Sequence, residues 1–240
     1  MPQDSQVPAT SGSLFDRVLS APAAQSLARR VESGGALSFA GVTASAQPFF
    51  AALLHRLFPQ RPIVVVTDSL KTQESFHQDL ETWLDQTRNT ERGTRSQDVG
   101  QSSILDSPSS ALFYPAWEIL PHEGKLPHAD IIAERLETLV ALGDNAERGT
   151  QNAGVIVTSA TALLQKTFPP TELKARTRKL QRGDQANLLD LIESLEELGY
   201  EPEAQVTHKG EIAMRGGIVD LFPPTSPWPV RLEFFGDELE

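Results

Sequence analysis

The sequence predicts an α/β domain with a mostly parallel sheet, followed by a smaller α+β domain. Two apolar runs, at residues 63–66 and 155–157, have the length of buried strands, and each precedes a segment with helical spacing. Alternation of strands and helices is typical of parallel sheets. After residue 170 the pattern changes to one helix and then short strands in which apolar and polar residues alternate. We therefore predict a lead-in at 1–25, an α/β domain at 26–170 and an α+β domain at 171–240.

The composition is that of a folded protein with few possible cofactor sites. The chain has 240 residues, of which 39% are hydrophobic, and this excludes wholesale disorder. Its net charge of −11 argues against coating nucleic acid or a membrane surface by charge alone. It has no cysteine, which excludes a thiolate metal site and fits a cytoplasmic location. No apolar run approaches the roughly 20 residues of a membrane span, and no export signal precedes the first helix.

The first half of the chain provides most of the predicted sheet domain. Helical spacing from residue 14 to 31 is broken at Pro22, and residues 36–40 form a short apolar segment, predicted to be a buried strand, that ends at Gly41. Apolar residues recur at helical spacing from Phe49 to Phe58. Residues 63–66 form a β-branched run, which predicts a strand covered on both faces.

A helix is predicted at residues 70–84, with four residues facing inward: Leu70, Phe76, Leu80 and Leu84. The polar residues 85–103 are predicted to form a surface loop. An amphipathic helix is predicted at 131–142, then a second polar loop at 143–153, the strand at 155–157 and a helix at 159–166.

The second domain begins after a basic segment. Residues 166–182 contain six cations and one acid, which either meet phosphate or an acidic partner or form a solvated face. A helix is predicted from 187 to 198, with Gly199 as its cap. Short strands follow between 210 and 240, and the chain is expected to stop inside this sheet.

The segment after Gly41 has the setting of a phosphate-binding loop, between an expected strand and a helix. A working loop needs a lysine for the phosphates and a hydroxyl for Mg²⁺. Ala44, Ala46, Gln47 and Pro48 stand in their place. We therefore predict a degenerate loop without nucleotide, and a tight turn with Pro48 at the start of the helix.

Other sites for chemistry have weak support in the sequence. His122 and His128 flank a loop, but they lack the spacing of a zinc motif, and we predict no metal and no catalytic residue. Phe113, Tyr114 and Trp117 cluster beside a proline. They could stack on bases, but packing against the sheet is the preferred interpretation.

The C-terminal residues 183–240 contain few cations among many acidic residues. They contain 13 acids and three cations, which are Lys209, Arg215 and Arg231. On a strand, Arg231 and Phe235 project from one face, while Leu232 and Phe234 enter the core. An exposed Arg–Phe pair is typical of interface hot spots. The alternative is that Glu233 merely neutralises Arg231 and that Phe235 is buried at an edge.

Two long motifs carry a family resemblance. GEIAMRGGIVDLFPP at 210–224 and PVRLEFFGDE at 229–238 closely resemble the N-terminal region of bacterial transcription-repair coupling factors (Mfd). YPAWE at 114–118, VIVT at 155–158 and ALLQ at 162–165 match that family in order and spacing, so the resemblance extends over about residues 26–240. It implies the module that coupling factors share with the helicase UvrB, a helicase-like domain followed by a smaller domain. The phosphate loop is intact in UvrB and is expected to be degenerate in this family.

The resemblance also implies a function and its residues. In the family this region docks UvrA, the damage-recognition ATPase, and the contacting residues fall on Arg215, Arg231 and Phe235. The parent protein is expected to be an ATP-dependent translocase that binds RNA polymerase and double-stranded DNA, with no membrane partner. No cofactor is expected in this segment. The alternative function is a UvrB-like helicase domain that binds nucleotide and damaged DNA, although residues 114–131 are too short for the DNA-binding hairpin of UvrB.

Overall fold

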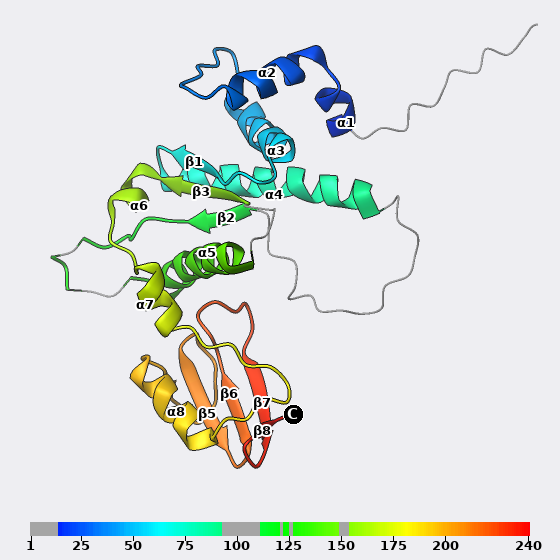
Figure 1. Ribbon diagram of the computed structural model, residues 1–240. Coiled ribbons are helices and arrows are strands. Elements are labelled where there is room, and N and C mark those ends of the chain that lie inside the picture. The colour runs from blue at the N-terminus through cyan, green and yellow to red at the C-terminus, as the bar shows by residue number, and fades with distance from the viewer. Residues whose placement is uncertain (1–13, 93–110, 121, 125–126, 149–153) are drawn as a thin grey trace, which may run out of the picture. The chain divides into compact units, whose positions relative to one another are not determined.

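The computed structural model describes residues 14–92, 111–120, 122–124, 127–148 and 154–240 (Figure 1). The chain divides into two compact units. One comprises residues 1–112 with 151–157, and the other comprises 113–150 with 158–240. Each unit has its own hydrophobic core. The domain limits predicted after residues 25 and 170 stay predictions.

Helices and strands alternate through the first part of the chain. The helices are α1 (Leu14–Leu19), α2 (Pro22–Glu32), the 3₁₀ turn η1 (Ala44–Ala46), α3 (Gln47–Leu57), α4 (Leu70–Arg92), α5 (Ala129–Arg148), α6 (Ala160–Leu164), α7 (Pro170–Ala175) and α8 (Leu188–Glu197). The first three strands are β1 (Ile63–Thr67), β2 (Ala111–Tyr114) and β3 (Val155–Ser159). They form a parallel sheet in the order β1-β3-β2, which confirms the predicted α/β fold class (Figure 1).

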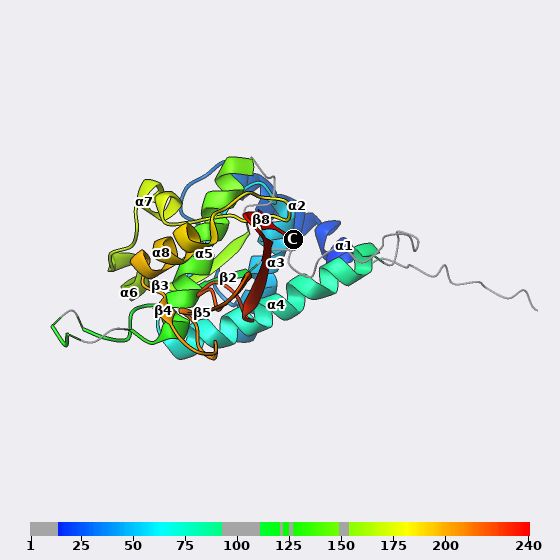
Figure 2. The same ribbon diagram turned by 90° about the horizontal axis from the view of Figure 1, so that it is seen from below.

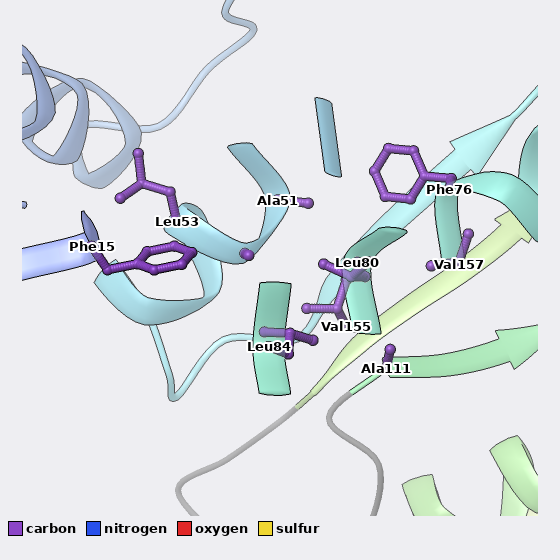
Figure 3. Close-up of a cluster of buried hydrophobic side chains, with 10 residues drawn as sticks. Phe15, Ala51, Leu53, Phe76, Leu80, Leu84, Ala111, Val155 and Val157 are labelled. Carbon is purple, nitrogen blue, oxygen red and sulfur yellow. The ribbon is translucent and has the colours of Figure 1, made fainter. Parts of the chain in front are cut away.

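The core of the first unit lies between helices and one face of this sheet. Figure 3 shows Phe76, Leu80 and Leu84 of α4 in one cluster with Val155 and Val157 of β3. All five are at least nine-tenths buried. Burying one such side chain contributes about 1.5–3 kcal/mol, so this cluster is a main source of the unit's stability.

Strand β1 is covered on one face only, which corrects the prediction for residues 63–66. Val64 and Val66 are 50% and 51% exposed, whereas Ile63 and Val65 pack against the core. The reason is position, since β1 lies at the edge of the sheet. A β-branched run reports strand propensity, but it does not report which faces are covered.

The strand predicted at residues 36–40 is wrong, because these residues are not in a strand and are largely exposed. Gly41 has a φ of +90°, and the chain passes through η1 into α3. Pro48 is the second residue of α3 and is fully buried. A proline is tolerated there because the first turn of a helix has no intrahelical acceptors for its N–H groups.

Two helices are longer than predicted, at the expense of the predicted loops. α4 continues to Arg92 and takes in 85–92 of the loop predicted at 85–103, and Figure 2 shows it as one long helix. α5 continues to Arg148, so much of the loop predicted at 143–153 is helical as well. The rest of both predicted loops lies largely outside the described residues. Leu70 is 48% exposed rather than inward-facing, because it is the first residue of α4.

The second unit contains a mixed five-stranded sheet. Its strands are β4 (Glu201–Pro202), β5 (Glu211–Arg215), β6 (Ile218–Leu221), β7 (Val230–Phe235) and β8 (Glu238–Leu239), in that spatial order. β4 pairs with β5 in parallel, and the other pairs are antiparallel. This sheet and α8 confirm the predicted smaller α+β domain.

Helix α8 covers one face of the five-stranded sheet. Leu191 and Leu195 of α8 are buried against Ile212 and Val219 of the sheet, with Leu232 packed beside them. Asn187 caps the helix by accepting hydrogen bonds from the N–H groups of Leu189 and Asp190, and Gly199 ends it at a φ of +96°. The other face of β5–β7 therefore carries the residues that alternate with this core.

The aromatic residues at 113–117 pack within the second unit around a buried arginine. Arg135 of α5 is 1% exposed, and its guanidinium lies 4.1 Å from the ring of Tyr114 and 4.2 Å from that of Trp117. It donates hydrogen bonds to the Tyr114 hydroxyl at 2.7 Å and to the carbonyl of Pro115 at 2.6 Å. The packed interpretation is thus confirmed over an exposed base-stacking platform. Desolvation lowers the pKa of Arg135.

Candidate protein-docking surface

The strand register places Arg215, Arg231 and Phe235 on one face of the five-stranded sheet. Arg215 of β5 is opposite Ile218 of β6, and Ile218 is opposite Glu233 of β7. Side chains opposite one another share a face, and alternate residues of one strand share it too. We call this face, with residues Arg215, Ile218, Asp220, Arg231, Glu233 and Phe235, the docking face. It is the face opposite α8.

Arg231 is held by an aspartate from the neighbouring strand. Asp220 lies directly opposite Arg231, and its two carboxylate oxygens accept hydrogen bonds from Nε and Nη2 at 2.7 and 2.9 Å. The hydrogen bond from Arg231 lowers the pKa of Asp220, and the same bond raises the pKa of Arg231. The direct partner of Arg231 is therefore Asp220, while Glu233 acts on it only as a nearby charge.

Arg215 is fixed by the main chain at the end of β5. Its Nη2 donates a hydrogen bond to the carbonyl of Ala204 at 2.7 Å. Its charge also contributes to the lowered pKa of Asp220. Asp220 thus lies in the field of both arginines of the docking face.

Phe235 is 80% exposed, so the alternative in which it is buried at an edge is wrong. Leu232 and Phe234 pack into the core from the other side of β7, as the alternation predicted. A second exposed aromatic is Trp228, which is 74% exposed on the segment that leads into β7. Ser226 bonds both the N–H and the carbonyl of Trp228, which fixes its main chain.

The turn between β5 and β6 depends on two glycines. Gly216 has a φ of +63°, a conformation that costs a residue with a side chain about 1–2 kcal/mol. Gly217 lies against β7, where a Cβ atom would be 2.6 Å from the carbonyl oxygen of Phe234. This turn therefore brings Arg215 into register with β6 and β7.

The residues of the degenerate phosphate loop are divided between a turn and a helix. Gly41 lies before η1, Ala44 and Ala46 are in η1, and Gln47 and Pro48 begin α3. The strand that would precede such a loop is missing at residues 36–40. Pro48 has no N–H to donate and is buried, and Gln47 has no cationic group. These residues thus offer little to bind a nucleotide phosphate.

The basic segment at 166–182 is partly neutralised within the second unit. Arg176 pairs with Glu172 at 3.3 Å and lies 5.7 Å from the ring of Phe168, and Lys179 pairs with Asp144 at 2.7 Å. Arg178 donates a hydrogen bond to Ser194 of α8. These contacts favour the solvated-face interpretation for half of its six cations.

The described residues contain no group of three or more histidines, cysteines, aspartates or glutamates suited to hold a metal ion. His128 lies next to Asp130, with 3.4 Å between its Nδ1 and the carboxylate. Within the same residues, no helix is both long and apolar enough to cross a membrane.

Comparison with known proteins finds a family match that contains the five-stranded sheet. Residues 179–240 match the model of the UvrB interaction domain, which includes α8 and the docking face. The chain is 41% identical over 127 residues to the transcription-repair-coupling factor of Mycobacterium bovis, covering 52% of this chain. The resemblance to the N-terminal region of coupling factors is confirmed. The factor of Escherichia coli is 36% identical over 124 residues, or 52% of this chain.

A broader match comes from Bacillus subtilis, whose coupling factor is 28% identical over 202 residues, or 84% of this chain. The matched parts make up 10% of the M. bovis and E. coli coupling factors and 15% of that from B. subtilis. The chain therefore spans a small part of the length of these coupling factors.

Asp220 is the residue of this face that the sequence reasoning missed. It lies 11 residues before Arg231, and only the register of β6 and β7 makes them opposite. The sequence signal that could have found Asp220 is that it is a lone acid in an otherwise apolar strand.

Proposed function

We propose that this chain is a protein-docking module of a transcription-repair coupling factor and that its docking face binds UvrA. The observation that carries the proposal is that the match to the UvrB interaction domain contains the exposed Arg215, Arg231 and Phe235. Arginine and aromatic side chains are enriched at interface hot spots, where the partner removes them from water. In the whole factor, the module recruits UvrA in the cytoplasm to an RNA polymerase stalled at a DNA lesion.

The chain performs this role without catalysis of its own. Gln47 and Pro48 supply neither the cation nor the hydroxyl that phosphates and Mg²⁺ require. ATP-driven movement on double-stranded DNA belongs to other parts of the parent protein. Calorimetry with Mg·ATP is expected to show no binding, and micromolar binding that a Gln47 substitution removes would instead favour the helicase-like alternative.

The test of the docking function is a calorimetric titration of purified UvrA with the chain and its variants. Arg215→Ala, Arg231→Ala and Phe235→Ala are each expected to weaken binding about thirtyfold, since a hot-spot side chain contributes about 2 kcal/mol. Two matched controls lie on the α8 side of the sheet. Arg178→Ala removes an exposed arginine and Leu189→Ala removes a leucine that is 66% exposed. Both are expected to change affinity less than twofold.

The fold is expected to survive these changes, because none of the substituted side chains is buried. Circular dichroism of each variant checks this. Equal affinity of wild type and the three docking-face variants would disprove the site, and the absence of UvrA binding by the wild-type chain would disprove the function.

A further inference from the structure

The guanidinium of Arg231 is already engaged in the free chain. Asp220 accepts from Nε at 2.7 Å and from Nη2 at 2.9 Å, so one edge of the arginine is closed by its own neighbour. An arginine has five N–H donors, of which this pair uses two. The three that remain point away from Asp220. The side chain of Arg231 is still 59% exposed, so those donors are accessible.

Two consequences follow from a bidentate pair at this place. First, it restricts the rotamers of an exposed arginine before any partner binds. The entropy cost of ordering this side chain is therefore not added to the free energy of binding. Second, the carboxylate of Asp220 lies in the field of both Arg231 and Arg215 and reduces the repulsion between them. A partner thus meets two cations in fixed positions rather than two mobile side chains.

We propose that Asp220 is a positioning residue of the docking face, which holds Arg231 with its outer edge toward an acceptor oxygen of the partner. This inference rests on the proposed UvrA-binding function. The competing role for Asp220 is that of a blocking group, which occupies Arg231 and must be displaced by the partner. The two roles predict opposite signs for the effect of removing the carboxylate.

The binding test uses Asp220→Ala, Asp220→Asn, Arg231→Ala and the double variant Asp220→Ala/Arg231→Ala, with UvrA as the partner. A positioning residue predicts that Asp220→Ala weakens binding about three- to tenfold. Asp220→Asn keeps one acceptor oxygen and is expected to lose less. In the Arg231→Ala background, Asp220→Ala is expected to have almost no further effect, because it acts through Arg231. Glu193→Ala, an exposed acid of α8, is the matched control.

Tighter binding of Asp220→Ala would show that Asp220 blocks Arg231, and it would overturn the proposal. The proposal would also be overturned if the loss of affinity in the double variant equalled the product of the losses in the two single variants. Asp220 would then act independently of Arg231. Loss of a surface ion pair leaves the fold intact, and thermal unfolding of each variant verifies this.

A second measurement does not involve UvrA. Nitrogen-15 relaxation of the Arg231 Nε–H is expected to give an order parameter near that of rigid backbone, about 0.85, in the wild type and below about 0.6 in Asp220→Ala. The exposed Arg29 of α2 serves as the mobile reference. If Arg231 is as mobile as Arg29 in the wild type, the proposal is wrong whether or not UvrA binds. If the wild-type chain fails to bind UvrA but Arg231 is rigid, only the proposed function fails.

Discussion

The buried side chain of Arg135 holds residues 114–117 in place, although the sequence shows only a cluster of aromatic residues there. Its guanidinium is buried between two rings and donates to Tyr114, Pro115 and Lys166, while its Nε has no hydrogen-bond partner among the described residues. A buried cation is costly unless its surroundings replace water. Here the π faces and carbonyl oxygens do so, and the pair of rings is fixed in return.

We expect Arg135→Ala to lower the free energy of unfolding by about 3–5 kcal/mol, because it leaves a cavity and removes the donor of two carbonyls and one hydroxyl. Arg135→Lys should also destabilise, since an ammonium cannot stack between two rings or donate as a fork. Urea denaturation measures both. Arg178→Ala, at an exposed site, is the control and is expected to change stability by less than about 0.5 kcal/mol. Equal stability of the Arg135 and Arg178 variants would contradict this role.

Glu211 gives a prediction for the dependence of stability on pH. Its carboxylate accepts from the N–H groups of Thr207 and His208 at 2.6 and 2.8 Å, and these bonds lower its pKa to about 2. A lowered pKa in the folded state stabilises the fold above the unfolded pKa of about 4.3. This contribution is lost as the pH falls from there through 2.

We expect the free energy of unfolding of Glu211→Gln to fall less steeply between pH 5 and pH 2 than that of the wild type, because the amide does not titrate. Urea denaturation at a series of pH values measures the slope. The control variant is Glu193→Gln, which replaces an exposed carboxylate of α8. A Glu211→Gln slope equal to the wild-type slope would show that these hydrogen bonds do not persist in solution.

At the scale of elements, the hairpin of β5 and β6 decides where the docking face forms. Gly217 passes so close to β7 that its carbonyl accepts a hydrogen bond from the N–H of Phe234 at 2.7 Å. A side chain at this position would push against main chain, which cannot rotate away. The close approach therefore links the turn directly to the strand that carries Arg231 and Phe235.

We expect Gly217→Ala to destabilise the chain by about 1–3 kcal/mol through overpacking. Gly143→Ala is the control, because Gly143 lies in α5, and apart from its own stretch of helix no described atom lies within 4 Å of an added Cβ. A glycine in the middle of a helix is unfavourable relative to alanine, so this change should stabilise by about 0.5–1 kcal/mol. Thermal unfolding of both variants measures the difference, and equal signs would contradict the argument.

At the scale of the whole molecule, the second core is contained in a short stretch of sequence. The residues of the core between α8 and the five-stranded sheet all lie between Leu180 and Phe234. The ion pairs Lys179–Asp144 and Lys209–Asp130 connect this stretch to α5, and exposed pairs of this kind contribute about 0–1 kcal/mol.

We expect a fragment of residues 177–240 to fold by itself, with cooperative urea unfolding and a low stability of a few kcal/mol, as is usual for about 60 residues. Its affinity for UvrA should lie within threefold of that of the full chain. A fragment without a cooperative transition would show that the core also needs residues before 177.

The sequence by itself determined most of the local elements and which side of β7 carries Arg231 and Phe235. Periodicity located α3, α8 and β7, because a helix and a strand repeat their buried positions at different intervals, and a continuous apolar run located β3. Alternation also separated Phe235, which is exposed, from Phe234, which is buried. The same reasoning failed at residues 36–40, where a short apolar run has no strand beside it, and at Val64 and Val66, which are exposed at a sheet edge.

Only the tertiary structure decided how these elements meet. The pairing of Arg231 with Asp220 depends on the register of two strands joined by a long connection, and register is set by turns and core packing rather than by either strand alone. The burial of Arg135 depends in the same way on segments about 20 to 30 residues apart in sequence. Sequence patterns record which side of an element is apolar, whereas the partner of a polar side chain is chosen by contacts that form only when the chain folds.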